Sequence, residues 1–580
     1  MLGKYFSKNK NRVYLPGEEI KVDRTLSFHR GSMGRDNDPL SVCRNRMGIA
    51  IAGFCAVYLL IAVKLFNLCV LSGIRNEENS HKVSNIQNPI RRADIIDRNG
   101  TIIATSLPTV NLYAKPHKVL NPEKAANELA KILPELKAED ILKKLHSKSK
   151  FVYLKRNLTP SQQYQINYLG IPGLDFENGE KRVYPHKNLF AHIIGKTNID
   201  NEGISGLEKA LNDRLTSSNI SLQLSVDVSV QDTIRLHLME GMKKYKALGA
   251  MAILMDVNTS EVISMVSLPD YDPNLNRTKN ERAMFNMATK GVYEPGSVLK
   301  IFNTAMSLES GKVKVSDRFD ATEPLKLKYN TIRDYRGENR WLSVPEILVY
   351  SSNIGSARMA LKVGGVEQRN FLEKLGFFDK LDIEVAEQGY PLVPGKWGEG
   401  TVASVAYGYG VAVSPLHVIS GYSAMVNGGI YHSPSLLKGS PKGKDGYRVI
   451  SFNTSKSMRK LMRLVVTDGS GKGANVKGYE VGGKTGTANK ISENGKYIDK
   501  KVRTTFVSAF PISDPKYALI VMMDEPKALK ETWGFVTAGW NSVPVASKII
   551  SAIAPQLNLK ANYDLDELRR QRIIDASYQR

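Results

Sequence analysis

Glu294-Pro295-Gly296-Ser297-Val298-Leu299-Lys300 is the segment from which the architecture of this 580-residue chain is best inferred. Pro295 and Gly296 interrupt whatever precedes them, and apolar residues then recur at helical spacing, namely Ile301, Phe302, Ala305, Met306 and Leu308. A helix starting here places Ser297 and Lys300 on one face of its first turn. The segment therefore predicts a serine nucleophile activated by a neutral, desolvated lysine, with the helix N-terminus favouring the oxyanion that follows.

A serine three residues before a lysine is not specific by itself, because the same spacing recurs elsewhere, at Ser147, Ser435 and Ser457. Two further motifs follow downstream, Ser351-Ser352-Asn353 and Lys484-Thr485-Gly486-Thr487. Their order is the one expected of serine acyl-transferases built from S-x-x-K, S-x-N and K-T-G. S-x-N spacing also recurs, but K-T-G occurs once. The joint order therefore favours an acyl-transferase, whereas each motif alone does not.

The K-T-G segment has groups suited to binding the end of a peptide. Lys484 offers a positive charge, and Thr485 and Thr487 offer hydroxyls, which together could hold a terminal carboxylate. Gly486 leaves room for a substrate beside the strand that residues 479–483 are expected to start. The backbone amides of Ser297 and Thr487 are the natural pair to polarise a carbonyl oxygen. The alternative for this segment is a plain turn.

The S-x-N segment has two interpretations. Ser351 could relay a proton between Lys300 and a leaving amine, and Asn353 could hydrogen-bond the substrate backbone. The alternative is that these residues cap a helix that begins at Ile354.

With these motifs, the chain resembles the class B penicillin-binding proteins, and among them the division-specific (FtsI-like) transpeptidases. The residues around Glu294 and Tyr350 look more septal than elongation-type. The resemblance extends over nearly the whole chain, through segments 91–100 (with Ala93 in place of the usual glycine), 182–185, 191–195, 203–208, 407–410 and 414–416.

An apolar run predicts a membrane anchor. Residues 47–71 are interrupted only by Lys64 and Asn67, and the run is long enough to cross a bilayer core of about 30 Å. Ten basic residues precede it, so the positive-inside rule keeps the N-terminus cytoplasmic and sends the rest of the chain outward. No small-residue cleavage site follows the run, so an uncleaved anchor is expected. The alternative is a buried helix of a soluble protein.

The positions of the cysteines and the distribution of charge argue against thiol chemistry and nucleic-acid binding. The three cysteines, Cys43, Cys55 and Cys69, lie before or inside the apolar run, so the exported part is expected to need neither disulfide nor thiol. The net charge of +24 is spread along the chain without a basic helix or zinc-finger spacing. Attraction to anionic membrane and wall polymers is therefore favoured over nucleic-acid binding. The nine histidines show no ligand spacing, and neither a metal nor a cofactor is expected.

Composition and pattern divide the chain into five parts: a basic cytoplasmic tail (1–46), a transmembrane anchor (47–71), a mixed module (72–222), an α+β domain (223–560) and a charged C-terminal tail (561–580). The resemblance implies that the third part is the family's pedestal or dimerisation module and that the fourth is its transpeptidase domain. Two β-hairpins are expected within the fourth part, one from residues 250–255 and 261–266, the other from 504–510 and 517–523. Hairpins at both ends with helices between them predict an α+β fold, in which an antiparallel sheet is flanked by helices.

The resemblance implies a septal peptidoglycan D,D-transpeptidase. Ser297 would attack a D-Ala-D-Ala stem peptide with help from Lys300 and Ser351, and an amine from a neighbouring strand would close the cross-link. It also implies inhibition by β-lactams, a periplasmic catalytic domain on a single-pass inner-membrane anchor, and partnership with a SEDS-family glycan polymerase and other division proteins.

Several alternatives remain open at the level of sequence. They are an elongation-type transpeptidase, a β-lactamase or carboxypeptidase that transfers the acyl group to water, a β-lactam sensor, and a catalytically silent division scaffold.

Overall fold

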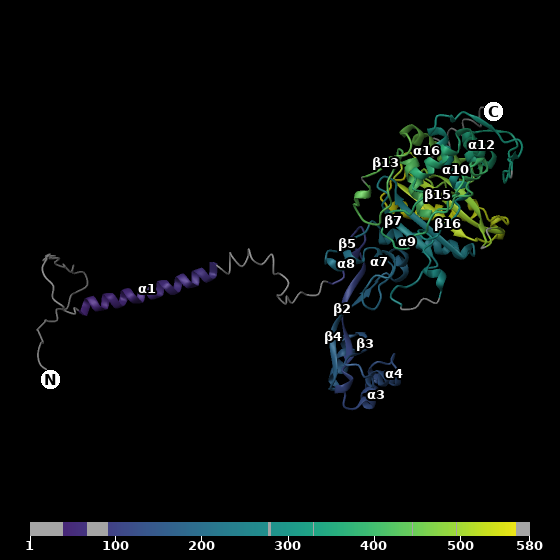
Figure 1. The fold of residues 1–580 in the computed structure, drawn as a ribbon. Coiled ribbons are helices and arrows are strands. Elements are labelled where there is room, and N and C mark those ends of the chain that lie inside the picture. Colours follow the sequence, from purple (N-terminus) through teal and green to yellow (C-terminus); the bar gives the residue numbers. More distant parts are fainter. Residues whose placement is uncertain are drawn as a thin grey trace, which may run out of the picture. The chain divides into compact units, whose positions relative to one another are not determined.

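The computed structural model describes residues 39–66 and 91–563, except for 276–279, 329, 444, 493 and 495. The chain separates into two compact units, Met1–Gln87 and Asn88–Arg580. In the first unit, the described residues form one helix, α1 (Pro39–Phe66) (Figure 1). The expected N-terminal tail up to residue 38, the end of the expected anchor from residue 67, and the C-terminal tail from residue 564 lie outside the described residues.

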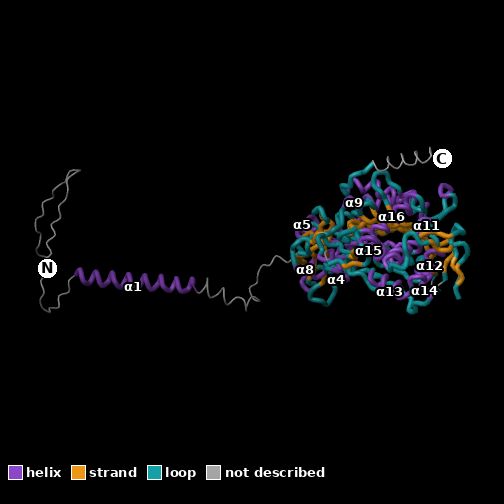
Figure 2. Tube along the Cα trace, turned by 90° about the horizontal axis from the view of Figure 1, so that it is seen from above, coloured by secondary structure: helices purple, strands orange, loops and turns teal. Residues whose placement is uncertain are grey.

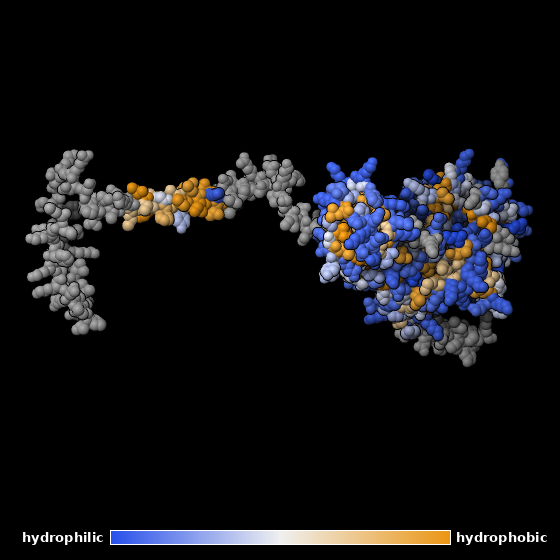
Figure 3. All heavy atoms as spheres, turned by 90° about the horizontal axis from the view of Figure 1, so that it is seen from below, coloured by the Kyte–Doolittle hydropathy of each residue, from blue (hydrophilic) through white to orange (hydrophobic). Residues whose placement is uncertain are grey.

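Helix α1 contains a segment, Met47–Leu65, that is long and apolar enough to cross a membrane. Its side chains are exposed, and Figure 3 shows apolar residues gathered along it. Apolar side chains exposed to water are unfavourable, whereas a bilayer core accommodates them. The backbone groups of the helix are already hydrogen-bonded to one another and need no water there. The helix begins before the expected anchor start at residue 47, since Pro39 already takes part in it.

The pedestal is built on a sheet with the order β3-β2-β1-β5, in which β4 also pairs with β2. The long strands β2 (Ile102–Ala114) and β4 (Leu174–Val183) pair antiparallel, from Thr105 opposite Val183 to Ala114 opposite Leu174. Around them lie β1 (Ile95–Ile96), β3 (Val152–Leu158), β5 (Leu222–Gln223), η2 (Pro116–Lys118), α3 (Pro122–Ile132), α4 (Ala138–Leu145) and α5 (Pro160–Tyr168).

The helices of the pedestal start where their local sequences predict. Asn121 accepts a hydrogen bond from the Lys124 amide and precedes a proline, and Thr159 forms a capping box with Gln162. Their apolar faces, with Leu129 and Ile141 at the centre, pack on Leu112 of β2. These contacts form a small core of their own at the end of the pedestal where Figure 1 shows α3 and α4.

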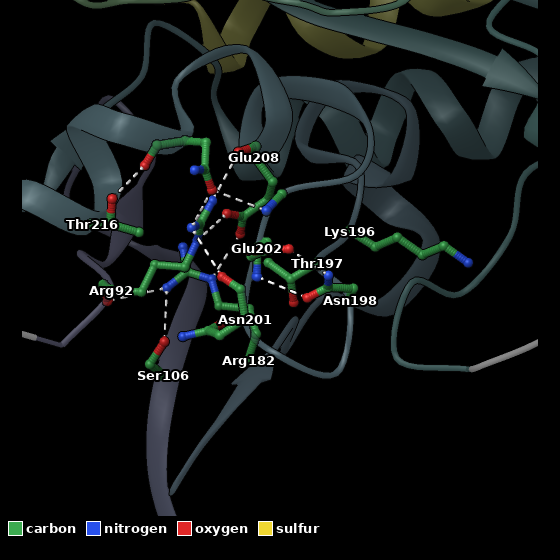
Figure 4. A network of polar contacts seen from close by, with 12 residues as sticks. Arg92, Ser106, Arg182, Lys196, Thr197, Asn198, Asn201, Glu202, Glu208 and Thr216 are labelled. Carbon is green, nitrogen blue, oxygen red and sulfur yellow. Dashed lines mark hydrogen bonds and ion pairs between the residues drawn. The ribbon is translucent and has the colours of Figure 1, made fainter.

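A buried ion cluster lies where the pedestal meets the larger domain. Both Arg92 and Arg182 contact the Glu208 carboxylate, at 2.6 and 2.7 Å from their Nε atoms. Arg92 also donates to Asn212 Oδ1 at 2.9 Å and to the Glu208 carbonyl at 2.8 Å. Figure 4 shows the two guanidinium groups converging on Glu208 from different segments. Each of the three residues comes from a different one of the segments that carry the family resemblance, namely 91–100, 182–185 and 203–208. The short elements here are η3 (Lys187–Phe190), α6 (Ala191–Ile194), α7 (Gly206–Ala210) and α8 (Asn212–Ser217).

The larger domain centres on a five-stranded sheet with the order β14-β15-β16-β6-β7 and antiparallel pairing throughout. The strands are β6 (Gly249–Asp256), β7 (Val262–Leu268), β14 (Gly482–Ile491), β15 (Tyr497–Phe510) and β16 (Tyr517–Asp524). Both expected hairpins, β6-β7 and β15-β16, are present, and β16 joins them by pairing with β6. The expected α+β fold with an antiparallel sheet is confirmed.

Helices cover both faces of this sheet, which explains why its central strands are apolar without interruption. On β6, Ala250, Ala252 and Leu254 face α9 (Val228–Lys244) and α17 (Ser542–Gln556), whereas Met251 and Ile253 face the opposite layer. Figure 2 shows α9 and α15 on opposite sides of the strands. That opposite layer contains α10 (Leu299–Glu309), α11 (Val344–Val349), α12 (Asn353–Val363), α13 (Gly365–Lys374), α14 (Glu399–Val405), α15 (Pro415–Val426) and α16 (Phe452–Thr467).

Short elements complete the domain. Three two-stranded ribbons pair β8 (Arg318–Asp320) with β11 (Trp341–Ser343), β9 (Leu325–Lys326) with β10 (Thr331–Ile332), and β12 (Ile430–Tyr431) with β13 (Tyr447–Arg448). Single turns of 3-10 helix are η4 (Glu281–Met284), η5 (Gly296–Val298), η6 (Pro441–Gly443), η7 (Lys472–Ala474), η8 (Lys530–Thr532) and η9 (Ala538–Trp540).

Candidate active site

Ser297 lies in the turn η5, which leads directly into the buried helix α10. The turn packs against strand β14, backbone to backbone. A Cβ on Gly296 would lie 2.9 Å from the Thr487 carbonyl oxygen, and a Cβ on Gly486 would lie 2.8 Å from the Pro295 carbonyl oxygen. Both glycines are therefore needed for the close approach, and Gly296 also has a φ of +57°. This approach brings Ser297 beside the K-T-G segment while leaving the serine partly exposed.

The two motif lysines meet at one hydroxyl. Lys300 Nζ lies 3.1 Å from Ser351 Oγ, and Lys484 Nζ lies 3.0 Å from the same oxygen. Lys300 Nζ also donates to Asn353 Oδ1 at 2.8 Å and to the Ser351 carbonyl. Lys484 Nζ donates to the Thr485 carbonyl at 3.0 Å. Segments more than 180 residues apart thus share one hydrogen-bonding centre, since Lys300 and Lys484 both contact Ser351.

Both lysines are fully buried, and this burial changes their acid–base behaviour. Burial lowers the pKa of Lys484 to about 7. Burial, and secondly the neighbouring Lys484 ammonium, lower the pKa of Lys300 well below its usual value, whereas the Asp334 carboxylate opposes the decrease. Lys300 can therefore be a neutral amine at neutral pH, which is the form that accepts a proton. The charge of Lys484 depends on pH near neutrality, although the sequence alone suggested a permanent cation.

Asp334 organises the S-x-N segment. Its carboxylate accepts hydrogen bonds from the Ile354 amide at 3.0 Å, from Ser352 Oγ at 2.7 Å and from the Asn353 amide. Ser352, rather than Ser351 or Asn353, is the N-cap of α12, since its Oγ accepts from the Gly355 amide. Ser351 lies just outside the helix with a φ of +59°, which turns its hydroxyl toward the two lysines.

Strand β14 is an edge strand, because it pairs only with β15. The hydroxyls on this strand have partners in neighbouring loops: Thr485 Oγ1 lies 2.5 Å from Ser470 Oγ, and Thr487 Oγ1 accepts from the Ala538 amide at 3.3 Å. An edge strand presents unpaired backbone groups to which an extended peptide can bind as an added strand.

Residues outside the three motifs also hold the turn η5 in place. The Gly296 amide donates to the Gly408 carbonyl at 3.2 Å. The Glu294 carboxylate accepts from the Gly410 amide at 2.7 Å and from the Tyr497 hydroxyl at 3.2 Å. Burial raises the pKa of Glu294, and these hydrogen bonds oppose the increase. The turn is therefore tied to the segment at 407–410 and to the start of β15.

Motif reasoning missed Asp334 and Ser470, and it offered a helix cap in the S-x-N segment without assigning it to Ser352. Asp334 lies 17 residues before Ser351, and no local pattern connects the two positions. Ser470 follows α16 in a loop rich in glycine, where a serine is unremarkable by itself. Only a Ser-Asn pair before an apolar helical run could have suggested the cap at Ser352.

Within the described ranges, no group of three or more His, Cys, Asp or Glu side chains could hold a metal ion. The titratable and hydroxyl groups that converge here are the lysines and serines described above. A partly exposed serine, a buried lysine one turn later and a second buried lysine on an edge strand form the arrangement expected of a serine acyl-transferase.

Comparisons with known proteins agree with this class. Residues 250–550 match the penicillin binding protein transpeptidase domain, and residues 87–235 match the penicillin-binding protein dimerisation domain. A probable peptidoglycan D,D-transpeptidase FtsI of Caulobacter vibrioides is 35% identical over 488 residues, covering 82% of this chain and 82% of that protein. The peptidoglycan D,D-transpeptidase FtsI of Escherichia coli K12 is 29% identical over 506 residues, covering 81% of this chain and 84% of that protein.

Solved structures show the same fold. A peptidoglycan synthetase from Bifidobacterium adolescentis superposes with a TM-score of 0.65 at 20% identity, covering 82% of this chain and 96% of that structure. The chain therefore belongs to the penicillin-binding proteins, in the class B, FtsI-like group of serine transpeptidases. The resemblance inferred from sequence motifs is confirmed.

Proposed function

We propose that this chain is a septal peptidoglycan D,D-transpeptidase that joins stem peptides through an acyl-enzyme on Ser297 and is inhibited by β-lactams. The observation that carries the proposal is the shared contact of Lys300 and Lys484 with Ser351 Oγ beside the Ser297 turn. Two buried amines with lowered pKa values around one hydroxyl are suited to moving protons and are costly as a purely structural arrangement.

In the first step, neutral Lys300 accepts the proton of Ser297 Oγ as that oxygen attacks the carbonyl carbon of the penultimate D-alanine. The Ser297 and Thr487 amides donate to the oxyanion. When the carbon–nitrogen bond breaks, the leaving D-alanine takes a proton from Ser351 Oγ, which is replaced by the proton held on Lys300. The products are an ester on Ser297 and free D-alanine, and Lys300 is neutral again.

The second step reverses these proton movements. An amine from a neighbouring stem peptide attacks the ester carbonyl and passes its proton through Ser351 to Lys300. The ester bond breaks, Lys300 returns the proton to Ser297 Oγ, and the new amide links the two peptides. Edge strand β14 supports this geometry because it can hold the acyl chain extended while the amine approaches from the opposite side.

Groups on β14 are suited to the terminal carboxylate of the substrate. Thr485 and Thr487 have hydroxyls, and the buried Lys484 adds a positive charge when it is protonated. Asn353 lies opposite, with Nδ2 donating to the Arg333 carbonyl at 2.9 Å, and its second Nδ2 hydrogen is suited to the substrate backbone. A β-lactam that mimics the terminal dipeptide would acylate Ser297 in the same way.

The proposed location is the division septum, with the N-terminus in the cytoplasm and the catalytic domain in the periplasm. The apolar helix α1 supports a single-pass anchor in the cytoplasmic membrane, and the FtsI-type relatives support the septal assignment. A separate SEDS-family glycan polymerase and other division-complex membrane proteins would be the partners. Fluorescence localisation of a tagged copy in growing cells distinguishes septal from lateral wall synthesis.

Labelling with a fluorescent penicillin tests the nucleophile. Ser297→Ala should abolish covalent labelling of the full-length, detergent-solubilised protein. Ser457→Ala is a matched control, because Ser457 also precedes a lysine by three residues and is also partly exposed, but lies on α16 with its Oγ donating to the Asn453 carbonyl. Labelling that persists in Ser297→Ala would refute the proposed nucleophile.

Two alternative functions have distinct outcomes. A β-lactamase or carboxypeptidase would release the acyl group to water rapidly, so the labelled species would be short-lived. A catalytically silent scaffold would support division as a Ser297→Ala variant. The intact lysine–serine centre favours transpeptidation over the scaffold, because a scaffold has no need of buried amines.

A further inference from the structure

Two hydrogen bonds join the helices α10 and α12. In the first, Lys300 Nζ donates to Asn353 Oδ1 at 2.8 Å. In the second, Asn303 Nδ2 donates to the Ser356 carbonyl at 3.0 Å. Each partner of the second bond follows its counterpart in the first by three residues, which is about one helical turn and keeps it on the same helix face. The two bonds therefore fix how far α10 lies along α12.

The second of these bonds is the one that water cannot replace. Asn353 is partly exposed, whereas 5% of the Asn303 surface and none of the Ser356 surface is exposed. A hydrogen bond that is enclosed in this way is stronger electrostatically than one that borders solvent. Asn303 is therefore better placed than Asn353 to hold the two helices in register.

Stability alone does not explain an amide at position 303. Among the described residues, Asn303 Oδ1 has no hydrogen-bond partner although it is buried. Asn303 also lines a small, mostly apolar cavity between α10 and α13, beside Phe302 and Leu372. A buried oxygen without a partner lowers stability, and fixing a water molecule beside it costs entropy. Leucine has similar branching and would avoid this cost, so a geometric role explains the amide better.

The position of α10 controls the position of the Lys300 amine, because Lys300 lies one turn before Asn303. Lys300 Nζ lies 3.1 Å from Ser351 Oγ, close to the upper limit of the distances suited to proton transfer. A displacement of about 1 Å is enough to slow a reaction about 100-fold. A small slip of α10 along α12 would therefore separate the base from its partner.

We infer that Asn303 is a positioning residue for acyl transfer, which sets the distance between the Lys300 amine and the Ser351 hydroxyl through its hydrogen bond to Ser356. The inference rests on the proposed function and adds to it a residue outside the three motifs. Asn303 itself is buried and acts only through Lys300.

Asn303→Leu tests this role, because it removes the hydrogen bond and the unpaired oxygen together. The Ser356 carbonyl still accepts the amide four residues later in α12, so no new unpaired group is created. Acylation by a fluorescent penicillin and urea unfolding are measured on the full-length, detergent-solubilised protein. The acylation rate constant should fall at least about tenfold, whereas the fraction labelled at saturation should not change.

A double-mutant cycle with Lys300→Met separates positioning from a general loss of structure. If Asn303 acts through Lys300, Asn303→Leu should not slow Lys300→Met any further. This comparison holds even if Asn303→Leu also lowers the urea midpoint, because it is made per labelled molecule.

The pH profile gives a second readout. The acceptors on α12 that bind the Lys300 ammonium favour its charged form, so their displacement in Asn303→Leu should move the acid limb of acylation to lower pH. The charged groups that face the amine from other elements, Lys484 and Asp334, are unchanged in this variant.

Gln368→Met is the matched control. Gln368 is a buried amide on the same cavity, but its hydrogen bonds go to the Val402 carbonyl and the Trp397 ring and do not involve α12. This variant should lower the urea midpoint, because it leaves those two groups unpaired, and should leave the acylation rate constant and the acid limb unchanged.

The outcomes separate this inference from the proposed function. A loss below about tenfold in Asn303→Leu, or an equal loss in the Lys300→Met background, refutes the positioning role while the transpeptidase proposal stands. An acid limb that stays in place or moves to higher pH also refutes it. If Ser297→Ala is still labelled, the proposed function fails and the positioning role fails with it.

Discussion

The protein buries two clusters of charged side chains, and they are built in opposite ways. In the pedestal, Arg92 and Arg182 enclose the Glu208 carboxylate at hydrogen-bonding distance, so opposite charges compensate each other. In the candidate active site, Lys300 and Lys484 share one serine hydroxyl, and among the described residues no carboxylate forms an ion pair with either amine. All five side chains are almost completely removed from solvent.

The difference separates a structural cluster from a chemical one. A buried carboxylate between two guanidinium groups keeps every member charged and fixes the geometry of three chain segments. Burial lowers the pKa of both amines, to about 7 for Lys484, and the neighbouring Lys484 charge lowers that of Lys300 further, so that an amine of this site is a base near neutral pH. The first arrangement should therefore matter for stability and the second for reactivity.

The largest expected effect is on reactivity, from replacing Lys300 by methionine. Loss of the general base should lower the rate of Ser297 acylation about 1,000-fold, while the urea midpoint of unfolding should not fall, because a desolvated amine is replaced by an apolar chain of similar length. The measurements are fluorescent-penicillin labelling and urea denaturation of the same samples. Lys460→Met is the control, because Lys460 also follows a serine by three residues but is exposed. Acylation of Lys300→Met within tenfold of wild type would contradict the assignment.

Breaking the pedestal cluster should lower stability and leave the rate of acylation nearly unchanged. Glu208→Gln leaves two buried guanidinium groups without a counter-charge, and the free energy of unfolding should fall by about 3 kcal/mol or more. Acylation per folded molecule should stay within about twofold of wild type, because the cluster does not contact the motif residues. Glu202→Gln, at an exposed position nearby, should cost less than about 0.5 kcal/mol. A loss in Glu208→Gln no larger than that of the control would show that the cluster is dispensable.

Lys484 should make stability depend on pH in the direction opposite to that of a lysine in an ion pair, whose pKa is raised on folding. Burial lowers its pKa in the folded state to about 7, whereas the unfolded lysine titrates near 10.4. Between these values the unfolded chain binds more protons, so stability rises with pH by up to about 1.4 kcal/mol per unit. Subtracting the unfolding free energies of Lys484→Met from those of wild type, between pH 7 and 9, isolates this slope. A flat difference would mean that Lys484 stays charged when buried.

The smallest expected effect comes from Asp334, whose carboxylate raises the pKa of Lys300 against burial. Asp334→Asn removes the charge, so the pKa of Lys300 falls further and its neutral form extends to lower pH. The acid limb of the acylation rate should therefore move to lower pH, while the plateau changes less than about threefold because the amide oxygen can still cap α12. Asp317→Asn, which removes a surface ion pair with Lys362, should not move the limb. A shift to higher pH would contradict the electrostatic role of Asp334.

Local sequence patterns predicted much of the fold. Pro295 and Gly296 before an apolar helical run predicted the start of α10. Pairs of short apolar runs separated by turn residues predicted both hairpins. Such features depend on interactions between residues close in the chain, which a sequence displays directly. The motif order also predicted which side chains belong to one site, although their roles in catalysis stay proposals.

Other features could not be predicted because they depend on segments far apart in the chain. Nothing around Asp334 indicates that it caps a helix beginning at Asn353, and nothing around Arg336 indicates a contact with Phe535, which is 199 positions later. The sequence likewise suggested that Lys484 is a permanent cation, whereas its charge is set by complete burial beside Ser351.

By itself, the sequence determined the family, the apolar helix, the hairpins and the motif side chains that meet at the candidate site, because each depends on residue types at short, fixed spacings. Only the tertiary structure decided which buried charged groups have a counter-charge and which do not. A pKa depends on what solvent and which charges surround a group, and those surroundings are assembled by packing distant segments together. The reactivity of Lys300 is therefore a property of the folded chain and cannot be assigned to any one of its motifs.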